Sequence, residues 1–569
     1  MGVSAAVFES AGKKTEHYKP GVYTRRNTVA ATTGLGADKL VVIGVSIGGK
    51  PLTLLKFSTP EAARNTLIGG SLLDGVLHAF NGSNDFVPQK VYAFIVNKNT
   101  PATHTMKSGE KNIIDVKTSI YGVPANNLKI WLKDGTTGKK LLYSFKGNEG
   151  SIDNITRPSF SLIYNGEGTN PTCTITSSGI KLEAADDGSA VDTFEATWEE
   201  QETVAELVAK INDTGVYAAT LLDLTENAPT NELDVCSTKQ LSTTATKFYS
   251  DVQALIEALE SVQYIGSGNV CLAEGATRIM PDNNDGYVYF SGAVAGSSTV
   301  EDWMTALDAL AKEKVQSITT PSTDENIHVL ISDHCAQCNT TAQKKERQYL
   351  VGMALGATLE QAKSEAARLN SEYGSLVVNS MTASNPSTGK SEEMCGALLA
   401  CKAAGVENAM ATSNPLTNKV MKVTAFGGPD DCDEMIANGI MPFGKNDDDE
   451  FVCIRAMTTY QSDNLALNER SCVREALYMD RDFRAAYSRT IGRDDEPSEG
   501  DVKDILIARA AEWYKSNLIV KNGTDDVFNI KVTFDADKTY VVHDRFLRTP
   551  RNFVFGTSNN LLYRSESEE

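Results

Sequence analysis

Short apolar runs of strand length alternate with helix-length amphipathic segments in residues 29–104. Two runs, Leu40-Val41-Val42-Ile43-Gly44 and Val91-Tyr92-Ala93-Phe94-Ile95-Val96, are uninterrupted, which is typical of strands buried on both faces. We expect a further strand at residues 52–57 and one helix rich in small residues at residues 60–80. Alternating helices and apolar strands predict βαβ crossovers and a largely parallel sheet.

The same α/β pattern returns in residues 241–500. Thr358 with Gln361 forms a capping box that predicts a helix start, and Tyr349-Leu350-Val351-Gly352 predicts a buried strand. A helix is expected at residues 392–404, ended by Gly405, and a long helix at residues 470–490. The two α/β parts therefore belong to one core that is interrupted by an insertion.

The intervening residues change to short alternating runs. Leu128-Lys129-Ile130-Trp131-Leu132 is followed by a turn at Asp134-Gly135 and by a second alternating run, which predicts a β-rich inserted domain. One helix is expected at residues 203–212. Residues 225–246, rich in Thr, Asn and Ser, have the composition of a linker out of the insertion.

These patterns predict a mixed α/β, multidomain chain with an α/β core sheet, a β-rich inserted protruding domain and extended terminal arms. Near the C-terminus, a hairpin-like unit is expected at residues 528–534 and 538–542. The expected boundaries are residues 1–28 for the N-terminal arm, 29–104 for the first part of the core, 105–240 for the insertion, 241–500 for the main core, 501–545 for its C-terminal part and 546–569 for the C-terminal arm.

The net charge of the 569-residue chain is −20, which repels nucleic-acid phosphates unless basic residues gather in one patch. The most basic run, Gln343-Lys344-Lys345-Glu346-Arg347, is broken by an acid, so we expect no nucleic-acid binding. No apolar stretch approaches the ~18 residues of a membrane span, and the first residues lack the basic lead of a signal peptide. We therefore expect no membrane insertion and production in the cytoplasm.

Two catalytic motifs begin at Gly44, and both fail on context. Gly44-Val45-Ser46-Ile47-Gly48 has the spacing of a nucleophile elbow, and Gly44 with Gly49-Lys50 has the spacing of a phosphate-binding loop. Each motif must lead into a helix, whereas Pro51 and a β-forming run follow here. We expect no catalytic residue, no cofactor site and no enzymatic activity.

Cysteine is the remaining candidate for chemistry. His334-Cys335-Ala336-Gln337-Cys338 offers a C-x-x-C pair beside a histidine, but a structural zinc site needs a second close pair, which is missing. We expect no metal site. Buried reduced thiols or post-assembly disulfides remain open for the ten cysteines. These disulfide candidates are Cys173, Cys236, Cys271, Cys335, Cys338, Cys395, Cys401, Cys432, Cys453 and Cys472.

Several short patterns resemble one family when they are taken in chain order. Pro20-Gly21-Val22-Tyr23 opens the folded part, and Val42-Ile43-Gly44 through Gly49-Lys50-Pro51 is a hydrophobic strand followed by glycines and proline. The most specific pattern is Arg455-Ala456-Met457-Thr458-Thr459-Tyr460. Together they resemble the contractile tail sheath proteins of bacteriophages, which are related to the sheaths of contractile bacteriocins and type six secretion systems. The ten cysteines and the residues before Pro20 are departures from that pattern.

The resemblance implies a structural virion subunit that polymerises with itself as hexameric rings in a helical sheath. Its implied partners are the tail tube protein and the baseplate and tail terminator proteins. Contraction of the sheath would drive the tube through the host envelope for genome ejection and host cell entry. The two alternatives are a doubly wound α/β enzyme and another tail or baseplate structural protein.

Apolar strands at chain ends are an aggregation liability unless they add to the edge of another sheet. We therefore expect Val22, Tyr23 and Thr24, and likewise Phe553, Val554 and Phe555, to form intersubunit arm strands. The alternative is that these strands pair within their own subunit.

Overall fold

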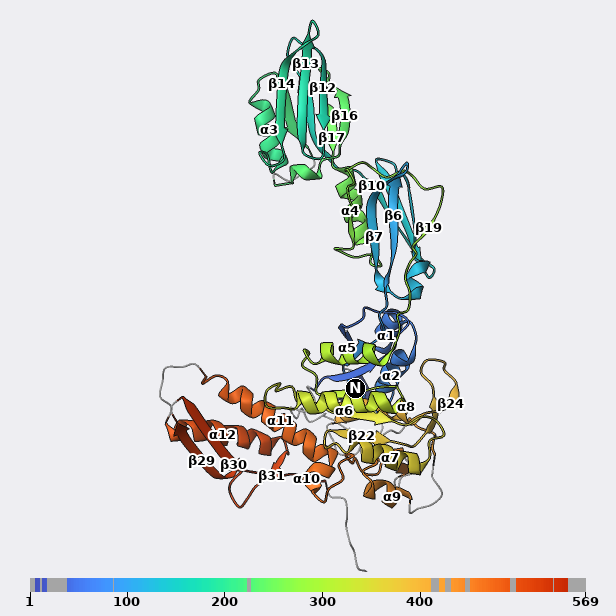
Figure 1. Ribbon diagram of the computed structural model, residues 1–569, viewed down its shortest axis with the longest axis vertical. Coiled ribbons are helices and arrows are strands. Elements are labelled where there is room, and N and C mark those ends of the chain that lie inside the picture. Colours follow the sequence, from blue (N-terminus) through green and yellow to red (C-terminus); the bar gives the residue numbers. More distant parts are fainter. Residues whose placement is uncertain are drawn as a thin grey trace, which may run out of the picture.

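The computed structural model has a broad α/β body, a lobe of helices and strands beside it, and a column of two β-rich modules rising from it (Figure 1). The described residues are 38–550 with gaps at 85, 223–226, 411–418, 425–430, 446–450, 492–497 and 536, together with the backbone of 6–10 and 13–17. Strands β1 (Ala6–Ser10) and β2 (Lys13–His17) pair antiparallel. The arm-strand residues 22–24 and 553–555 lie outside the described residues.

A six-stranded sheet organises the α/β body in the order β22-β21-β20-β3-β5-β4. Its strands are parallel except for β4, which runs antiparallel to β5, so the predicted largely parallel sheet is confirmed. All five residues of β3 are buried, which explains its uninterrupted apolar run. The strands are β3 (Leu40–Gly44), β4 (Leu54–Phe57), β5 (Val91–Ile95), β20 (Ser317–Thr319), β21 (Gln348–Gly352) and β22 (Gly374–Val377).

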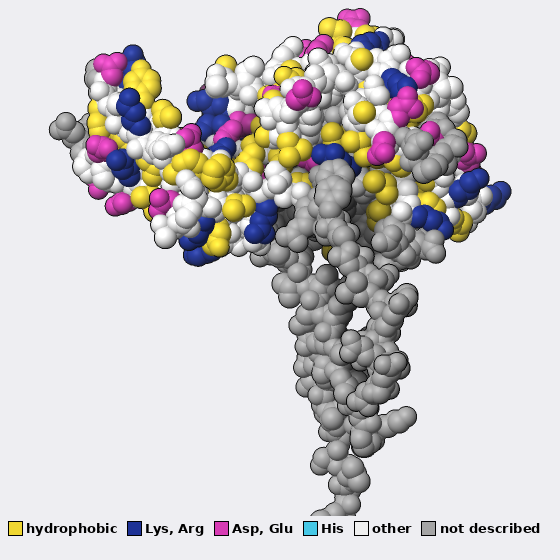
Figure 2. Space-filling model, turned by 90° about the horizontal axis from the view of Figure 1, so that it is seen from below, with side chains coloured by type: hydrophobic (Ala, Val, Ile, Leu, Met, Phe, Trp, Pro, Cys, Tyr) yellow, Lys and Arg dark blue, Asp and Glu magenta, His cyan; other side chains and the backbone are white. Residues whose placement is uncertain are grey.

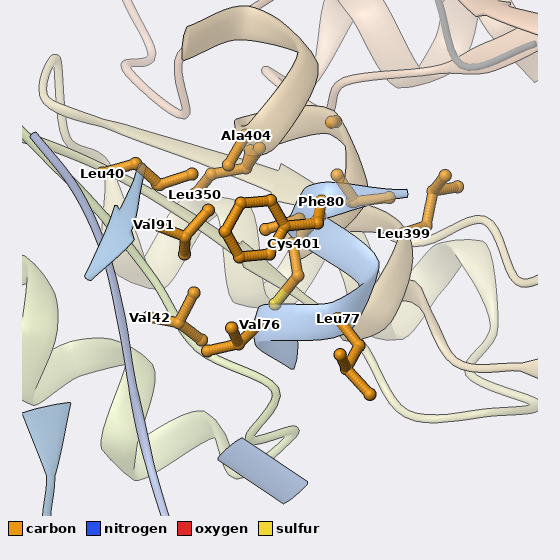
Figure 3. Packing of buried hydrophobic residues seen from close by; sticks show 14 of the residues in the cluster. Leu40, Val42, Val76, Leu77, Phe80, Val91, Leu350, Leu399, Cys401 and Ala404 are labelled. Atoms are coloured by element: carbon orange, nitrogen blue, oxygen red, sulfur yellow. The ribbon is translucent and has the colours of Figure 1, made fainter. Parts of the chain in front are cut away.

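Helices cover both faces of this sheet. Leu40 and Val42 point into one apolar core, where Phe80 and Cys401 pack against the strands (Figure 3), while Val41 and Ile43 point into the core on the opposite face. The first core is covered by α1 (Pro60–Leu67), α2 (Ser71–Phe80) and α8 (Gly396–Met410), and the second by α5 (Val300–Leu310), α6 (Glu325–Cys338) and α7 (Leu359–Leu369).

Shorter elements complete the body and extend it beyond the sheet. They are β23 (Met381–Ser384), β24 (Ser391–Met394), β25 (Lys422–Val423), α9 (Asp431–Ala437), β26 (Phe443–Lys445), β27 (Phe451–Cys453) and α10 (Leu465–Asn468). The fold is thus of the mixed α/β, multidomain class predicted from the pattern.

Two helix predictions were wrong because glycine serves close packing at these positions. The segment predicted as one helix is broken between α1 and α2, where Ile68 has φ 67° and a Cβ on Gly70 would lie 2.8 Å from the Val45 carbonyl oxygen. Helix α8 runs through Gly405 instead of ending there. A Cβ on Gly405 would lie 1.9 Å from the Ala79 carbonyl oxygen, so this glycine lets α2 and α8 approach closely.

The insertion after β5 consists of two modules, one nested within the other. The proximal module has one apolar core drawn from residues 102–155 and 252–293, and the distal module has a separate core drawn from residues 160–248. The proximal elements are β6 (Pro101–Ser108), β7 (Lys111–Tyr121), β8 (Lys129–Asp134), β9 (Lys139–Phe145), β10 (Asn148–Ile155), α4 (Asp251–Ser261), β18 (Val270–Leu272) and β19 (Val288–Tyr289). The distal elements are β11 (Pro158–Tyr164), β12 (Thr169–Ile175), β13 (Gly179–Asp186), β14 (Ser189–Thr197), α3 (Val204–Asn212), β15 (Tyr217–Leu221), β16 (Cys236–Gln240) and β17 (Thr246–Tyr249).

The strand pairing carries the insertion past residue 240. Strand β17 pairs with β11, β18 pairs with β7, and β19 pairs with β8. The stretch 225–246, whose polar composition predicted a linker, contains β16 at the edge of a distal sheet. We therefore propose insertion boundaries near residues 100 and 295 instead of 105 and 240.

The lobe beside the body is built from the C-terminal residues. It contains α11 (Arg470–Tyr487), α12 (Glu499–Lys515), β28 (Ile519–Val520), β29 (Phe528–Asp535), β30 (Lys538–Asp544) and β31 (Phe546–Leu547). Met479, Leu506 and Trp513 lie in its small separate core, so we propose that this C-terminal unit begins at α11. The predicted long helix and the hairpin are confirmed. Among the helices of the described ranges, none has the length and apolar character to cross a membrane.

Candidate interaction surface at the C-terminal hairpin

Strands β29 and β30 form an antiparallel hairpin, here called the C-terminal hairpin. Its inner face packs on the lobe: Val532, which lies opposite Val541, is buried, and Val541 and Ile530 pack against the small core. The His543 ring lies 5.8 Å from the Phe483 ring and 6.4 Å from the Trp513 ring. One face of the hairpin is therefore fixed to α11 and α12.

The other face of the C-terminal hairpin is open and carries two exposed apolar side chains among polar ones. Val542, which lies opposite Lys531, is 60% exposed, and Tyr540, which lies opposite Thr533, is 50% exposed. Within the described ranges, neither β29 nor β30 pairs with a third strand. Unpaired edges beside exposed apolar side chains are the features that accept an added strand from another chain.

A carboxylate in α11 joins the two helices beneath the hairpin. Asp482 accepts hydrogen bonds from Arg509 Nε and Nη2, both at 2.8 Å, and from Trp513 Nε1 at 2.7 Å. Arg509 and Trp513 lie on α12, whose Trp513 ring is buried in the lobe core. Charge-assisted hydrogen bonds of this kind fix geometry as well as adding stability, so the hairpin rests on a well-positioned support.

A buried ion pair joins the lobe to the α/β body. Arg470 at the start of α11 donates to Glu407 on α8 through Nε at 2.9 Å and Nη2 at 3.1 Å, and to the Tyr349 carbonyl oxygen at 2.8 Å. Burial raises the pKa of Glu407, but Arg470 and Arg474 outweigh it and hold that pKa below its usual value. The guanidinium therefore faces an ionised carboxylate inside the protein.

Further ion pairs continue this connection along α11. Arg481 donates to Asp38 at 2.8 Å, Arg474 lies 3.8 Å from the same carboxylate, and Arg484 pairs with Glu346. Burial raises the pKa of Asp38 despite these two arginines. One face of α11 therefore contacts the body at several points.

The motif residues near Gly44 serve structure in this fold. The Ser46 side chain is buried, and its hydroxyl donates to the Gly48 carbonyl oxygen at 2.6 Å and to the Leu67 carbonyl oxygen at 3.0 Å. Strand β4, not a helix, follows the loop. The hydroxyl is thus committed to backbone acceptors, which is a loop-fixing role and not that of an activated nucleophile.

The residues of the C-x-x-C motif also make contacts that stabilise the fold. Arg347 Nη1 donates to His334 Nε2 at 2.9 Å, and Cys338 Sγ lies 3.9 Å from the same nitrogen. Burial and then the Arg347 charge lower the pKa of His334 to about 3. A cation beside this histidine disfavours a metal ion. No cluster of three potential metal ligands occurs among the described residues.

All ten cysteines are free thiols in the structure. The fold brings two of them into contact, Cys173 and Cys236 in the distal module. Charged side chains of both signs are interspersed among the described residues of the face seen from below (Figure 2). The open face of the C-terminal hairpin was missed by the sequence reasoning, although alternation at Tyr540 and Val542 was a visible signal.

No family model matches the chain. Two curated proteins are similar to it. The chain is 24% identical over 578 residues to the tail sheath protein of Bacillus phage SP01, with 96% of each chain covered. It is also 24% identical over 421 residues to the putative tail sheath protein of Enterococcus phage phiEF24C, covering 69% of this chain and 70% of that protein.

Two solved structures share the fold. The sheath tail protein from Listeria innocua aligns with a TM-score of 0.53 and 12% identity, covering 91% of this chain and 99% of that one. The sheath tail protein from Desulfitobacterium hafniense aligns with a TM-score of 0.50 and 12% identity, covering 93% and 100%. Similarity in sequence and in fold extends over nearly the whole chain, and it concerns structural proteins, not enzymes. The comparisons thus relate this chain, over nearly its whole length, to phage tail sheath proteins.

Proposed function

We propose that the protein polymerises as stacked hexameric rings around a tail tube and contracts to drive that tube through the host envelope. The observation that carries the proposal is the C-terminal hairpin, which has an open face with exposed Tyr540 and Val542 and has unpaired edges in the described part of the chain. A sheath subunit needs such a surface because it must hold its neighbours while the lattice rearranges. The subunit is assembled in the host cytoplasm and becomes part of the virion tail.

The terminal arms supply the strands that complete this hairpin in neighbouring subunits. Val22, Tyr23 and Thr24 form one arm strand, and Phe553, Val554 and Phe555 form the other. Added strands make main-chain hydrogen bonds along the edges of β29 and β30, and their aromatic side chains cover Tyr540 and Val542. Residues 551–569, when extended, reach at most roughly 65 Å.

No bond chemistry is required for contraction in this proposal. The extended lattice is metastable, and its subunits rotate into larger interfaces while the exchanged strands act as hinges. The tail tube protein lies inside the sheath, the baseplate and tail terminator proteins bound its two ends, and the distal module of the insertion protrudes outward. The connection from the hairpin through α11 to the sheet supports this role because it lets rotation of one subunit pull on the next.

Strand exchange is tested with four full-length variants. Val542→Lys places a charge on the open face of the hairpin, and Val191→Lys is the matched control, since Val191 is an exposed valine on β14 in the distal module. Val554→Pro removes an amide donor from the C-terminal arm strand, and Ser565→Pro is its control near the chain end.

We expect the wild type and both controls to sediment as tubes that are visible by negative-stain electron microscopy. Val542→Lys and Val554→Pro should remain as small soluble species. The melting temperature of Val542→Lys should be unchanged, because Val542 is exposed in the subunit. Tubes formed by Val542→Lys as readily as by Val191→Lys would contradict the proposed acceptor surface.

A further inference from the structure

Two cysteines lie on adjacent strands of the distal module, in contact with each other. Cys173 is on β12 and Cys236 is on β16, the edge strand of the sheet β14-β13-β12-β16. Cys236 pairs directly with Ile175, two residues along β12 from Cys173, so Cys173 and Cys236 are diagonal neighbours on one face of the sheet. Cys173 is buried in the module core, and Cys236 is half-buried against that core.

The local backbone brings the two sulfur atoms together. The register between β12 and β16 shifts between Cys173 and Ile175, and Thr238 adopts a φ of 41° on the bulged strand. The Cys236 Sγ lies 4.0 Å from the Cys173 carbonyl oxygen, and the two thiols are close enough that each shifts the pKa of the other. Ordinary diagonal neighbours lie about 7–8 Å apart, and a disulfide needs a Cα separation of about 4.4–6.8 Å, so a bond between them requires the irregular register to bring these two residues closer.

We propose that Cys173 and Cys236 form an intramolecular disulfide when the protein passes from the reducing cytoplasm to an oxidising medium, fastening edge strand β16 to β12. The passage to that medium rests on the proposed function in a released virion. The thiol chemistry does not, because it is a property of one chain and is tested on that chain without polymerisation.

The environment assigns different roles to the two thiols. The hydrogen bond from the Cys173 thiol, with smaller contributions from the Ile175 backbone and Lys239, lowers the pKa of Cys236 to about 7, whereas burial raises the pKa of Cys173. At neutral pH the half-buried Cys236 is therefore substantially a thiolate and can attack first. The buried Cys173 resolves the intermediate.

The oxidant is a low-molecular-weight disulfide, for example oxidised glutathione. The Cys236 thiolate attacks one of its sulfur atoms, the glutathione S–S bond breaks, and one glutathione leaves as a thiolate. Cys173 then loses its proton to water and attacks Cys236 Sγ, which forms the Cys173–Cys236 bond and releases the second glutathione. Two protein thiols are oxidised and one glutathione disulfide is reduced to two thiols.

The experiment uses the full chain with Cys271→Ser, because Cys271 is exposed on β18 and would otherwise react independently. The protein is incubated with oxidised glutathione, quenched in acid and denatured, and its remaining thiols are alkylated before peptide mass spectrometry. The internal reference is Cys335 with Cys338, one helical turn apart on α6, whose thiol pKa values are raised by burial.

We expect Cys173 and Cys236 to lose alkylation together, at least about ten times faster than the reference pair, and to appear in one linked peptide. The rate should rise with pH to a half-maximum near 7, following the thiolate of Cys236. Adding Cys236→Ser should leave Cys173 fully alkylated. A persistent glutathione adduct on Cys236 with Cys173 still free, or protection of Cys236 no faster than that of Cys335, would overturn the proposal.

Discussion

Replacing Glu407 with glutamine should destabilise the attachment of α11 far more than the same change at an exposed ion pair. In the native protein the Arg470 side chain is 1% exposed and that of Glu407 is 6% exposed. Glu407→Gln keeps the volume but leaves the guanidinium buried without its carboxylate. Removing one partner of a buried pair costs about 3–5 kcal/mol, because a buried charge is left uncompensated.

The matched control is Glu257→Gln in the proximal module. Glu257 makes a two-pronged pair with Arg157, as Glu407 does with Arg470, but the side chains of Arg157 and Glu257 are 24% and 48% exposed. Water can hydrate the Arg157 guanidinium when the Glu257 carboxylate is removed, so the free energy of unfolding should fall by less than about 1 kcal/mol.

Amide hydrogen exchange measures both variants locally, which matters because a chain with several cores need not unfold in one step. The free energy of opening of α11 should fall by about 3–5 kcal/mol in Glu407→Gln, whereas that of α4 should change little in Glu257→Gln. The double variant Glu407→Leu with Arg470→Met should recover most of the loss, since it leaves no unpaired charge. Equal effects of Glu407→Gln and Glu257→Gln would refute the claim that this pair anchors the lobe.

Three further predictions follow from particular contacts. His78 is buried, and burial lowers its pKa to about 3. The free energy of unfolding should therefore fall as the pH drops from 6.5 towards 3, by up to about 1.4 kcal/mol per pH unit. Urea titrations should show a smaller fall over this pH range in His78→Leu than in the wild type, and an equal fall would contradict this. Gly405→Ala should destabilise the protein by about 1–3 kcal/mol in thermal unfolding, because its Cβ meets the Ala79 carbonyl oxygen; the stabilisation usual for alanine in a helix would show the contact to be loose. Tube yield measured by light scattering should rise with salt, since screening weakens repulsion between chains of net charge −20, and equal yields in low and high salt would count against this.

Much of the α/β body could be predicted because its signals are local. Strands β3 and β21 are apolar runs covered on both faces, and the Thr358 capping box marks the start of α7. The continuation of α8 through Gly405 could not be predicted, because the reason lies in the backbone of α2, more than 300 residues away in sequence. Glycine signals a helix end only where no neighbouring element occupies the space that a larger side chain would fill.

The extent of the insertion also depended on distant pairing. Strands β18 and β19 are three and two residues long, and they exist because β7 and β8 present open edges to them. Prediction of the interaction surface from the sequence was limited in the same way. Alternation predicted the C-terminal hairpin, but whether the face carrying Tyr540 and Val542 is covered depends on what packs against it.

The central claim is that this chain assembles into a sheath through its own surfaces. Negative-stain electron microscopy of the purified full-length protein tests it most directly. We predict long hollow striated tubes whose end-on views show six subunits per ring. Monodisperse monomers that never polymerise under any salt condition would contradict the account.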